Sequence, residues 1–72
     1  MANPVCVRLG QRIRKARLAY GWTQQILADH AELSKTHVCE VEVGKREVGL
    51  LALRRIAHAL GVTLSDLVKG LD

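Results

Sequence analysis

The sequence predicts an all-α protein, and three observations support this fold class. Apolar residues recur at helical spacing along almost the whole chain. Residues that favour helix N-termini precede these segments, and glycines that favour helix C-termini follow them. No segment of useful length alternates apolar and polar residues as a half-buried strand does. We therefore expect five helices in one domain that spans residues 1–72.

The first helix is expected to begin at Val5 or Val7 and to end at Ala19, because Gly21 is a favoured C-terminal stop. A second helix has Thr23 as its N-cap and runs from residue 24 to about residue 30. The inward stripes of these two helices combine apolar character with helical spacing, and they comprise Leu9, Ile13, Ala16, Leu27 and Ala28.

A break at residues 30–33 separates the second helix from a third, which has Ser34 as its N-cap and Gly44 as its stop. Residues 23–44 therefore form two short helices joined by a tight turn, which is the geometry of a helix-turn-helix motif. A basic loop at 45–49 leads to a fourth helix over 50–60 and a short last helix. The apolar residues of these last two helices include Leu53, Ile56, Ala57, Leu60, Leu64, Leu67 and Val68.

Charge and cysteine content restrict the classes of function. The chain carries 11 Lys and Arg against 7 Asp and Glu, so a net charge of +4 suits an anionic partner such as nucleic acid. No apolar run is long enough to cross a bilayer, and the N-terminus lacks the layout of a signal peptide. Cys6 and Cys39 follow no disulfide pattern and are expected to be free thiols in a reducing cytoplasm.

Metal binding and catalysis are not expected. His37 and Cys39 lie two residues apart on one helix, so their side chains point about 200° apart, and no CxxC or HxxxH pattern is present. Ser34, His37 and Glu42 include the residue types of a hydrolytic set, but they share one short helix without an oxyanion feature. We expect no cofactor, no small-molecule ligand and no enzyme activity.

The third helix has two faces of different character. On a helical wheel, Val38 and Val41 point toward the core. The outward residues are Thr36, Cys39, Glu40 and Val43, with Lys35 and His37 on the flanks. Such a face suits either a solvated surface or a recognition helix in the major groove of DNA. The neighbours favour the second, because Gln24 can offer its amide to one phosphate, and Lys45 and Arg46 lie where another can be held.

The span from Leu9 to Val68 resembles the Cro/C1-type (XRE) helix-turn-helix family. The matching marks are Ile13 and Arg17 within RIRKAR, GWTQQILA at 21–28, Ser34, Val38, VEVGKR at 41–46, and LRRIAHALGVTLSDLV at 53–68. The resemblance implies a compact five-helix, lambda-repressor-like domain. It further implies a transcriptional regulator that binds a palindromic operator in double-stranded DNA as a homodimer, with the third helix, 34–43, in the major groove.

The resemblance also implies roles for individual residues. Those placed to read base edges are Lys35, Thr36, Cys39 and Glu40, and those placed at the DNA backbone are Gln24, Ser34, His37, Lys45 and Arg46. Arg17 and Glu42 fall at positions that commonly form a buried ion pair between the first and third helices.

A two-fold interface is expected to use apolar residues that a monomer leaves exposed. The candidates are Leu50, Leu51, Leu64, Val68 and Leu71. Alternatively, Leu64 completes the core together with Leu67.

Three residues depart from the family pattern. Glu32 replaces the usual glycine of the turn, so a positive φ there either costs about 1 kcal/mol or is avoided by a reshaped turn. Val48 replaces a proline that is frequent in the following loop. Glu40 places a negative charge toward the DNA, where it either accepts a hydrogen bond from a cytosine amine, is tolerated, or pairs with Lys35 or Arg46 and tempers non-specific binding.

Within the family, the stretch SKTHVCEVEVGKREVGLLAL at 34–53 is most similar to restriction–modification controller proteins. Those proteins often carry Arg-Thr-Tyr where this chain has Lys35-Thr36-His37, and Arg-Asn where it has Arg46-Glu47. Two alternatives stay open: a phage-type repressor, and an antitoxin-type module that chiefly binds a toxin and binds DNA secondarily.

Overall fold

The computed structural model describes residues 3–71, so residues 1–2 and 72 of the expected 1–72 domain lie outside the described part. The helices are α1 (Pro4–Ala19), α2 (Gln24–Ala31), α3 (Lys35–Glu42), α4 (Leu50–Leu60) and α5 (Leu64–Val68). No strand occurs between residues 3 and 71. The predicted all-α fold class with five helices is confirmed.

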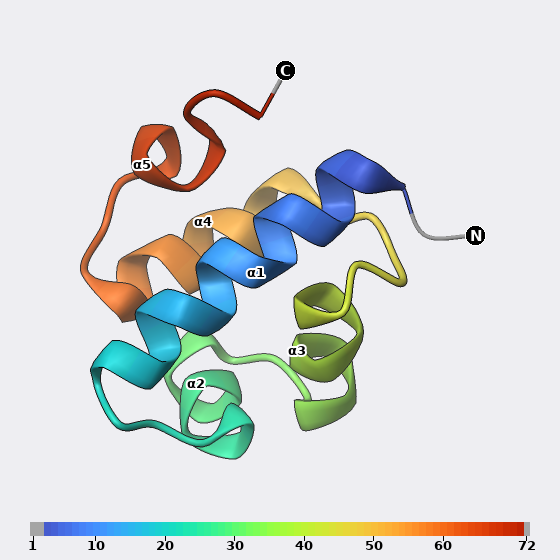
Figure 1. Cartoon of the computed structure of the whole chain (residues 1–72). Helices are drawn as coiled ribbons and strands as arrows, with labels where there is room; N and C mark the ends of the chain where they lie inside the picture. The colour runs from blue at the N-terminus through green and yellow to red at the C-terminus, as the bar shows by residue number, and fades with distance from the viewer. Residues whose placement is uncertain (1–2, 72) are drawn as a thin grey trace.

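Helices α1 and α4 pass each other at the centre of the molecule (Figure 1). The shorter α2 and α3 lie on one side of this pair, and α5 lies on the other. Helix α2 packs against both α3 and α4, while α1 packs against α3, α4 and α5. The two helices of the expected helix-turn-helix motif are therefore held from two sides by the longer helices.

An aliphatic core joins these helices, as the absence of Phe from the chain requires. Its largest fully buried side chains come from four of the five helices, and they are Ile13, Leu27, Val38, Ile56 and Leu60. The predicted inward positions of α2, α3 and α4 are confirmed, while Ala16 on α1 is only partly buried.

Three helix boundaries differ from the sequence prediction, and one of them is the end of α3, which lies at Glu42 rather than at residue 43. Helix α1 begins at Pro4, before both expected starts, because the Asn3 side chain accepts a hydrogen bond from the backbone N–H of Val5 at 2.8 Å. Proline fits this first turn because its missing N–H has no partner to lose there. Helix α2 extends to Ala31, so it ends one residue later than expected.

The turn between α2 and α3 keeps its left-handed shape without a glycine. Glu32 has φ 57° and ψ 42°, and it is the one non-glycine residue with positive φ among residues 3–71. Its backbone N–H donates to the carbonyls of Ala28 and Asp29 and so closes the end of α2. The first of the two expected outcomes is therefore correct, and the turn retains a strain of about 1 kcal/mol.

The C-terminal segment is fastened to α1 by two arginines. Arg12 donates to the carbonyl oxygen of Leu67 at 3.2 Å, and Arg8 donates to that of Gly70 at 3.1 Å. This places Leu71 in the core with only 5% of its surface exposed. Leu71 therefore does not lie at an exposed two-fold interface as expected, because its apolar side chain completes the core of one chain.

Helices α1 and α3 touch backbone to backbone at Gly10. A Cβ atom built on Gly10 would overlap the carbonyl oxygens of Val41 and Glu42, which end α3. Only glycine allows this approach, and the approach sets the distance between the two helices.

We predict that Gly10→Ala lowers the free energy of unfolding by about 2 kcal/mol, because overpacking against a rigid backbone forces the helices apart. Urea denaturation followed by the fluorescence of Trp22 measures the change. The matched control is Gly49→Ala, because a Cβ there meets no atom within 4 Å. If both variants unfold at the same urea concentration as the parent, the close approach of α1 and α3 does not constrain the fold.

Candidate nucleic-acid interface

The outer face of α3 is accessible along its length. Lys35, Thr36 and Cys39 are exposed, and Glu40 is half-buried at the edge of this face. The side chains of Val38 and Val41 on the opposite face are almost completely buried. The predicted division of α3 into a core face and an outer face is confirmed, and the four predicted base-reading residues share one surface.

The N-terminus of α3 is closed by its own cap. The hydroxyl of Ser34 accepts a hydrogen bond from the backbone N–H of His37 at 3.0 Å. Ser34 is exposed and His37 is half-buried. The Ser34 hydroxyl therefore stabilises the helix, and it retains an O–H that can donate to a second acceptor.

A buried ion pair joins α1 to α3, as the family resemblance implied. Arg17 Nε donates to Glu42 Oε2 at 2.7 Å, and Arg17 Nη2 donates to Glu42 Oε1 at 3.0 Å. The third guanidinium nitrogen, Nη1, donates to the carbonyl oxygen of Trp22 at 2.6 Å. Arg17 and Glu42 are 7% and 5% exposed, so this two-point pair is shielded from solvent.

Gln24 connects the start of α2 to the same ion pair. Its Nε2 donates to Glu42 Oε1 at 3.2 Å, and the side chain is half-buried. An amide nitrogen carries two protons, so the second can donate to another acceptor such as a phosphate oxygen. The N-cap of α2 is Thr23, whose side chain accepts from the backbone N–H of Ile26 at 3.2 Å. The first residue of α2 is thus oriented by a contact with α3.

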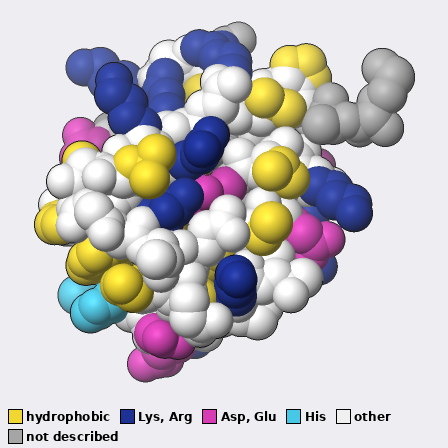
Figure 2. Space-filling view, turned by 60° about the horizontal axis from the view of Figure 1, so that its bottom comes forward, with side chains coloured by type: hydrophobic (Ala, Val, Ile, Leu, Met, Phe, Trp, Pro, Cys, Tyr) yellow, Lys and Arg dark blue, Asp and Glu magenta, His cyan; other side chains and the backbone are white. Residues whose placement is uncertain are grey.

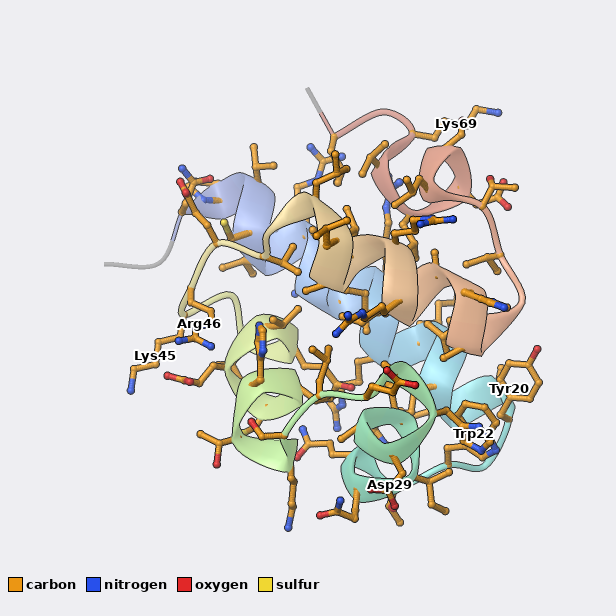
Figure 3. The ribbon with its side chains drawn as sticks, turned by 180° about the vertical axis from the view of Figure 1, so that it is seen from behind. Tyr20, Trp22, Asp29, Lys45, Arg46 and Lys69 are labelled. Atoms are coloured by element: carbon orange, nitrogen blue, oxygen red, sulfur yellow. The ribbon has the colours of Figure 1, made fainter. Side chains whose placement is uncertain are left out.

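The C-terminus of α3 ends in a tight backbone turn. Gly44, with φ 74°, donates to the carbonyl of Val41 at 3.1 Å, and Lys45 donates to that of Glu40 at 2.9 Å. This pair of bonds is a Schellman motif, which turns the chain back beside the helix. The side chains of Lys45 and Arg46 consequently lie together at the end of α3 (Figure 3). Arg46 Nη1 lies 3.9 Å from Glu40 Oε1.

The face that contains α2 and α3 carries charges of both signs. Figure 2 shows basic side chains at several separate places on this face, with acidic side chains between them. The face is therefore not a uniformly basic surface, and its charges can distinguish positions along an anionic partner.

The candidate interface residues outside α3 differ in exposure. Leu50 and Leu51 at the start of α4 are 71% and 68% exposed, and Val68 on α5 is 42% exposed. Leu64 is partly buried against the core, which agrees with the alternative expectation for that residue. Leu50 and Leu51 are the most exposed large apolar side chains among the described residues, while others lie on α1, on α2 and at the end of α3.

The sequence did not predict a stack of three rings that joins the turn before α2 to the last turn of α2. The rings of Tyr20 and Trp22 lie 4.7 Å apart, and those of Trp22 and His30 lie 4.6 Å apart and nearly parallel. Tyr20 also donates its hydroxyl hydrogen to the carbonyl of Leu60 at 2.9 Å, which ties this region to α4. No helical periodicity signals such a stack, because it depends on the turn between α1 and α2.

Other kinds of site are not seen in the part of the chain that the structure describes. Residues 3–71 contain no group of three or more His, Cys, Asp or Glu side chains that could hold a metal ion. No helix there is long and apolar enough to cross a membrane. Cys6 is half-buried and Cys39 is exposed, and both are free thiols.

Comparisons with known proteins agree on one family. A family model described as helix-turn-helix matches residues 13–67. The control protein C.MunI of Mycoplasma sp is 32% identical over 71 residues, covering 97% of this chain and 96% of the relative. The control protein C.BamHI of Bacillus amyloliquefaciens is 35% identical over 69 residues, covering 94% and 85%. The crystal structure of the restriction-modification controller protein C.AhdI from Aeromonas hydrophila superimposes with a TM-score of 0.84 at 37% identity, covering 86% of this chain and 94% of that one.

We predict that Glu42→Leu lowers the free energy of unfolding by about 3–5 kcal/mol, because the buried Arg17 guanidinium is left without its counter-charge. A small domain has on the order of 5–10 kcal/mol in total, so the variant should lose most of its stability. Thermal unfolding followed by circular dichroism measures the loss. The double variant Arg17→Met/Glu42→Leu should be more stable than Glu42→Leu alone. A double variant that loses the sum of the two single losses would show that the pair is not coupled.

Proposed function

Because the chain belongs to the helix-turn-helix family of transcriptional regulators, we propose that it binds a palindromic operator in double-stranded DNA as a homodimer. In this proposal α3 enters the major groove, and the start of α2 lies across the sugar–phosphate backbone. The protein regulates transcription by occupying that operator.

The observation that carries this proposal is the Arg17–Glu42–Gln24 contact. It holds the N-terminus of α2 and the whole of α3 in one fixed arrangement, while the outer face of α3 stays exposed. A recognition helix needs both conditions, since phosphate contacts set its position and exposed side chains read the bases.

We assign two roles to the residues around this surface. The side chains that read base edges in the proposal are Lys35, Thr36, Cys39 and Glu40. Those that contact the backbone are Gln24, Ser34, His37, Lys45 and Arg46. The free amide proton of Gln24 and the charges of Lys45 and Arg46 support the second group, because phosphate oxygens accept such donors.

The proposed dimer buries the exposed apolar side chains of Leu50, Leu51 and Val68, with Leu64 at the edge. Burial of such side chains between two copies is favourable by about 25 cal/mol per Å² of apolar surface. The molecule measures 27 Å along its longest axis, so two copies in contact can present their α3 helices about 34 Å apart. This spacing equals one turn of DNA and matches a palindromic site.

Among regulators of this family, we favour a restriction–modification controller. The similarity to the two named control proteins covers 96% and 85% of their lengths, which supports this choice. A regulator of this kind binds DNA near its own gene, in this proposal.

The direct test is a gel shift and footprint with DNA from upstream of the gene. We expect a retarded complex with two protected half-sites about one helical turn apart. If each dimer neutralises about six phosphates, affinity should fall about 10³-fold between 50 and 200 mM salt. Absence of binding to any DNA from the locus at low salt would overturn the proposal. Copurification with the product of an adjacent toxin gene, without DNA binding, would instead support an antitoxin.

Variants at two positions separate base reading from backbone contact. Thr36→Ala should cost about 1–3 kcal/mol on the operator and relax the preference at one base pair, because a base-edge contact is lost. Gln24→Ala should weaken binding to all sequences about equally, because phosphate contacts carry no sequence information. Fluorescence anisotropy with operator and scrambled duplexes measures both effects. Circular dichroism provides the folding control, since Gln24 also contacts Glu42. A change in base preference for Gln24→Ala would contradict its role.

A further inference from the structure

A negative side chain on the candidate DNA-reading surface needs a physical explanation. Glu40 lies at the edge of the outer face of α3, and its side chain is 28% exposed. A carboxylate beside the phosphates of DNA is repelled unless a positive group or a hydrogen-bond donor meets it. If the protein binds DNA as proposed, this carboxylate bears on how the surface distinguishes one sequence from another.

The backbone places a specific partner beside Glu40. The Schellman motif at Gly44 returns the chain so that the N–H of Lys45 donates to the carbonyl oxygen of Glu40 itself. Gly44 cannot be replaced easily, because its φ is 74° and an added Cβ would lie 2.6 Å from the Cα of Val7. The turn is therefore fixed between α3 and α1. Its backbone path places Arg46 next to Glu40.

The two side chains form a loose, partly exposed ion pair. Arg46 Nη1 and Glu40 Oε1 are 3.9 Å apart, and the Arg46 side chain is 47% exposed. A pair with this exposure and separation is weak and can be exchanged for other partners. Lys45 and Glu47 flank Arg46, and neither forms an ion pair within the described residues. Arg46 is thus the one basic residue of the loop that is held by a carboxylate.

We propose that the Glu40–Arg46 pair makes DNA affinity depend on a cytosine in the major groove. On non-cognate DNA, Arg46 stays with Glu40 and contributes no phosphate contact. On cognate DNA, the carboxylate of Glu40 accepts a hydrogen bond from the N4 amine of cytosine, which is the characteristic partner of a carboxylate in the major groove. Arg46 is then released to a phosphate, so base recognition and backbone binding strengthen together.

The salt dependence of non-specific binding tests the release of Arg46. The probe is a duplex of scrambled sequence, and the variant is Glu40→Gln, which removes the charge and keeps the size. Each additional phosphate contact adds about 0.9 to the slope of log K against log salt concentration. We therefore expect Glu40→Gln to steepen the slope by about 0.9 per subunit and to raise non-specific affinity about fivefold per subunit at about 150 mM salt. The double variant Glu40→Gln/Arg46→Gln should show no steepening.

The matched control is Glu47→Gln, which removes the same charge one residue from Arg46 without removing an ion pair. It should leave the slope unchanged. Equal effects of Glu40→Gln and Glu47→Gln would show that net charge alone matters, and the proposal would be wrong. An unchanged slope for Glu40→Gln would also overturn it, because Arg46 would then contact phosphate in the parent protein too.

Selection from a pool of random duplexes tests the cytosine. The parent protein should enrich a C·G pair at one position in each half-site, and Glu40→Gln should lose that preference while still binding. Retention of the same preference by Glu40→Gln would contradict the proposed reading role. Failure of the parent protein to bind any duplex would instead reject the proposed DNA binding, so the two failures are distinguishable.

Discussion

The contact of Arg17 with Glu42 is the interaction on which the rest of the candidate interface depends. One guanidinium reaches the carboxylate of α3 and the carbonyl that precedes α2, and the same carboxylate receives the amide of Gln24. Three helices therefore meet at a single buried charge pair. Such a pair contributes little net stability compared with apolar residues, but its directional bonds fix a relative orientation. Orientation is what a surface needs if it must match a partner of fixed shape.

Much of this structure could be predicted from the sequence, because helical periodicity and caps are local. The inward positions of α2, α3 and α4 follow directly from spacing, and the ends at Gly21, Gly44 and Gly61 follow from glycine itself. The misassignment of Leu71 has a different origin. Core residues and interface residues are both apolar, and only the packing of the C-terminal segment distinguishes them.

The sequence alone could not predict the roles that depend on tertiary packing. Arg8 and Arg12 belong to a basic run on α1 that suits a nucleic-acid contact, yet both hold carbonyls of the C-terminal segment. The choice of Arg46 over Lys35 as the partner of Glu40 depends on the backbone turn after α3. Positive charge counted along a sequence therefore overstates the charge that is free to meet an anionic partner.

The close approach at Gly10 has a consequence for how this protein can diverge. Because α3 is set against α1 by backbone atoms and held by buried residues on one side, its outer side chains carry none of the packing. Substitutions at Thr36 or Cys39 should leave the fold unchanged. Duplicated copies of such a gene can thus acquire different DNA targets by a few substitutions on α3 while they keep the same fold. Regulators of different genes can then coexist in one cell.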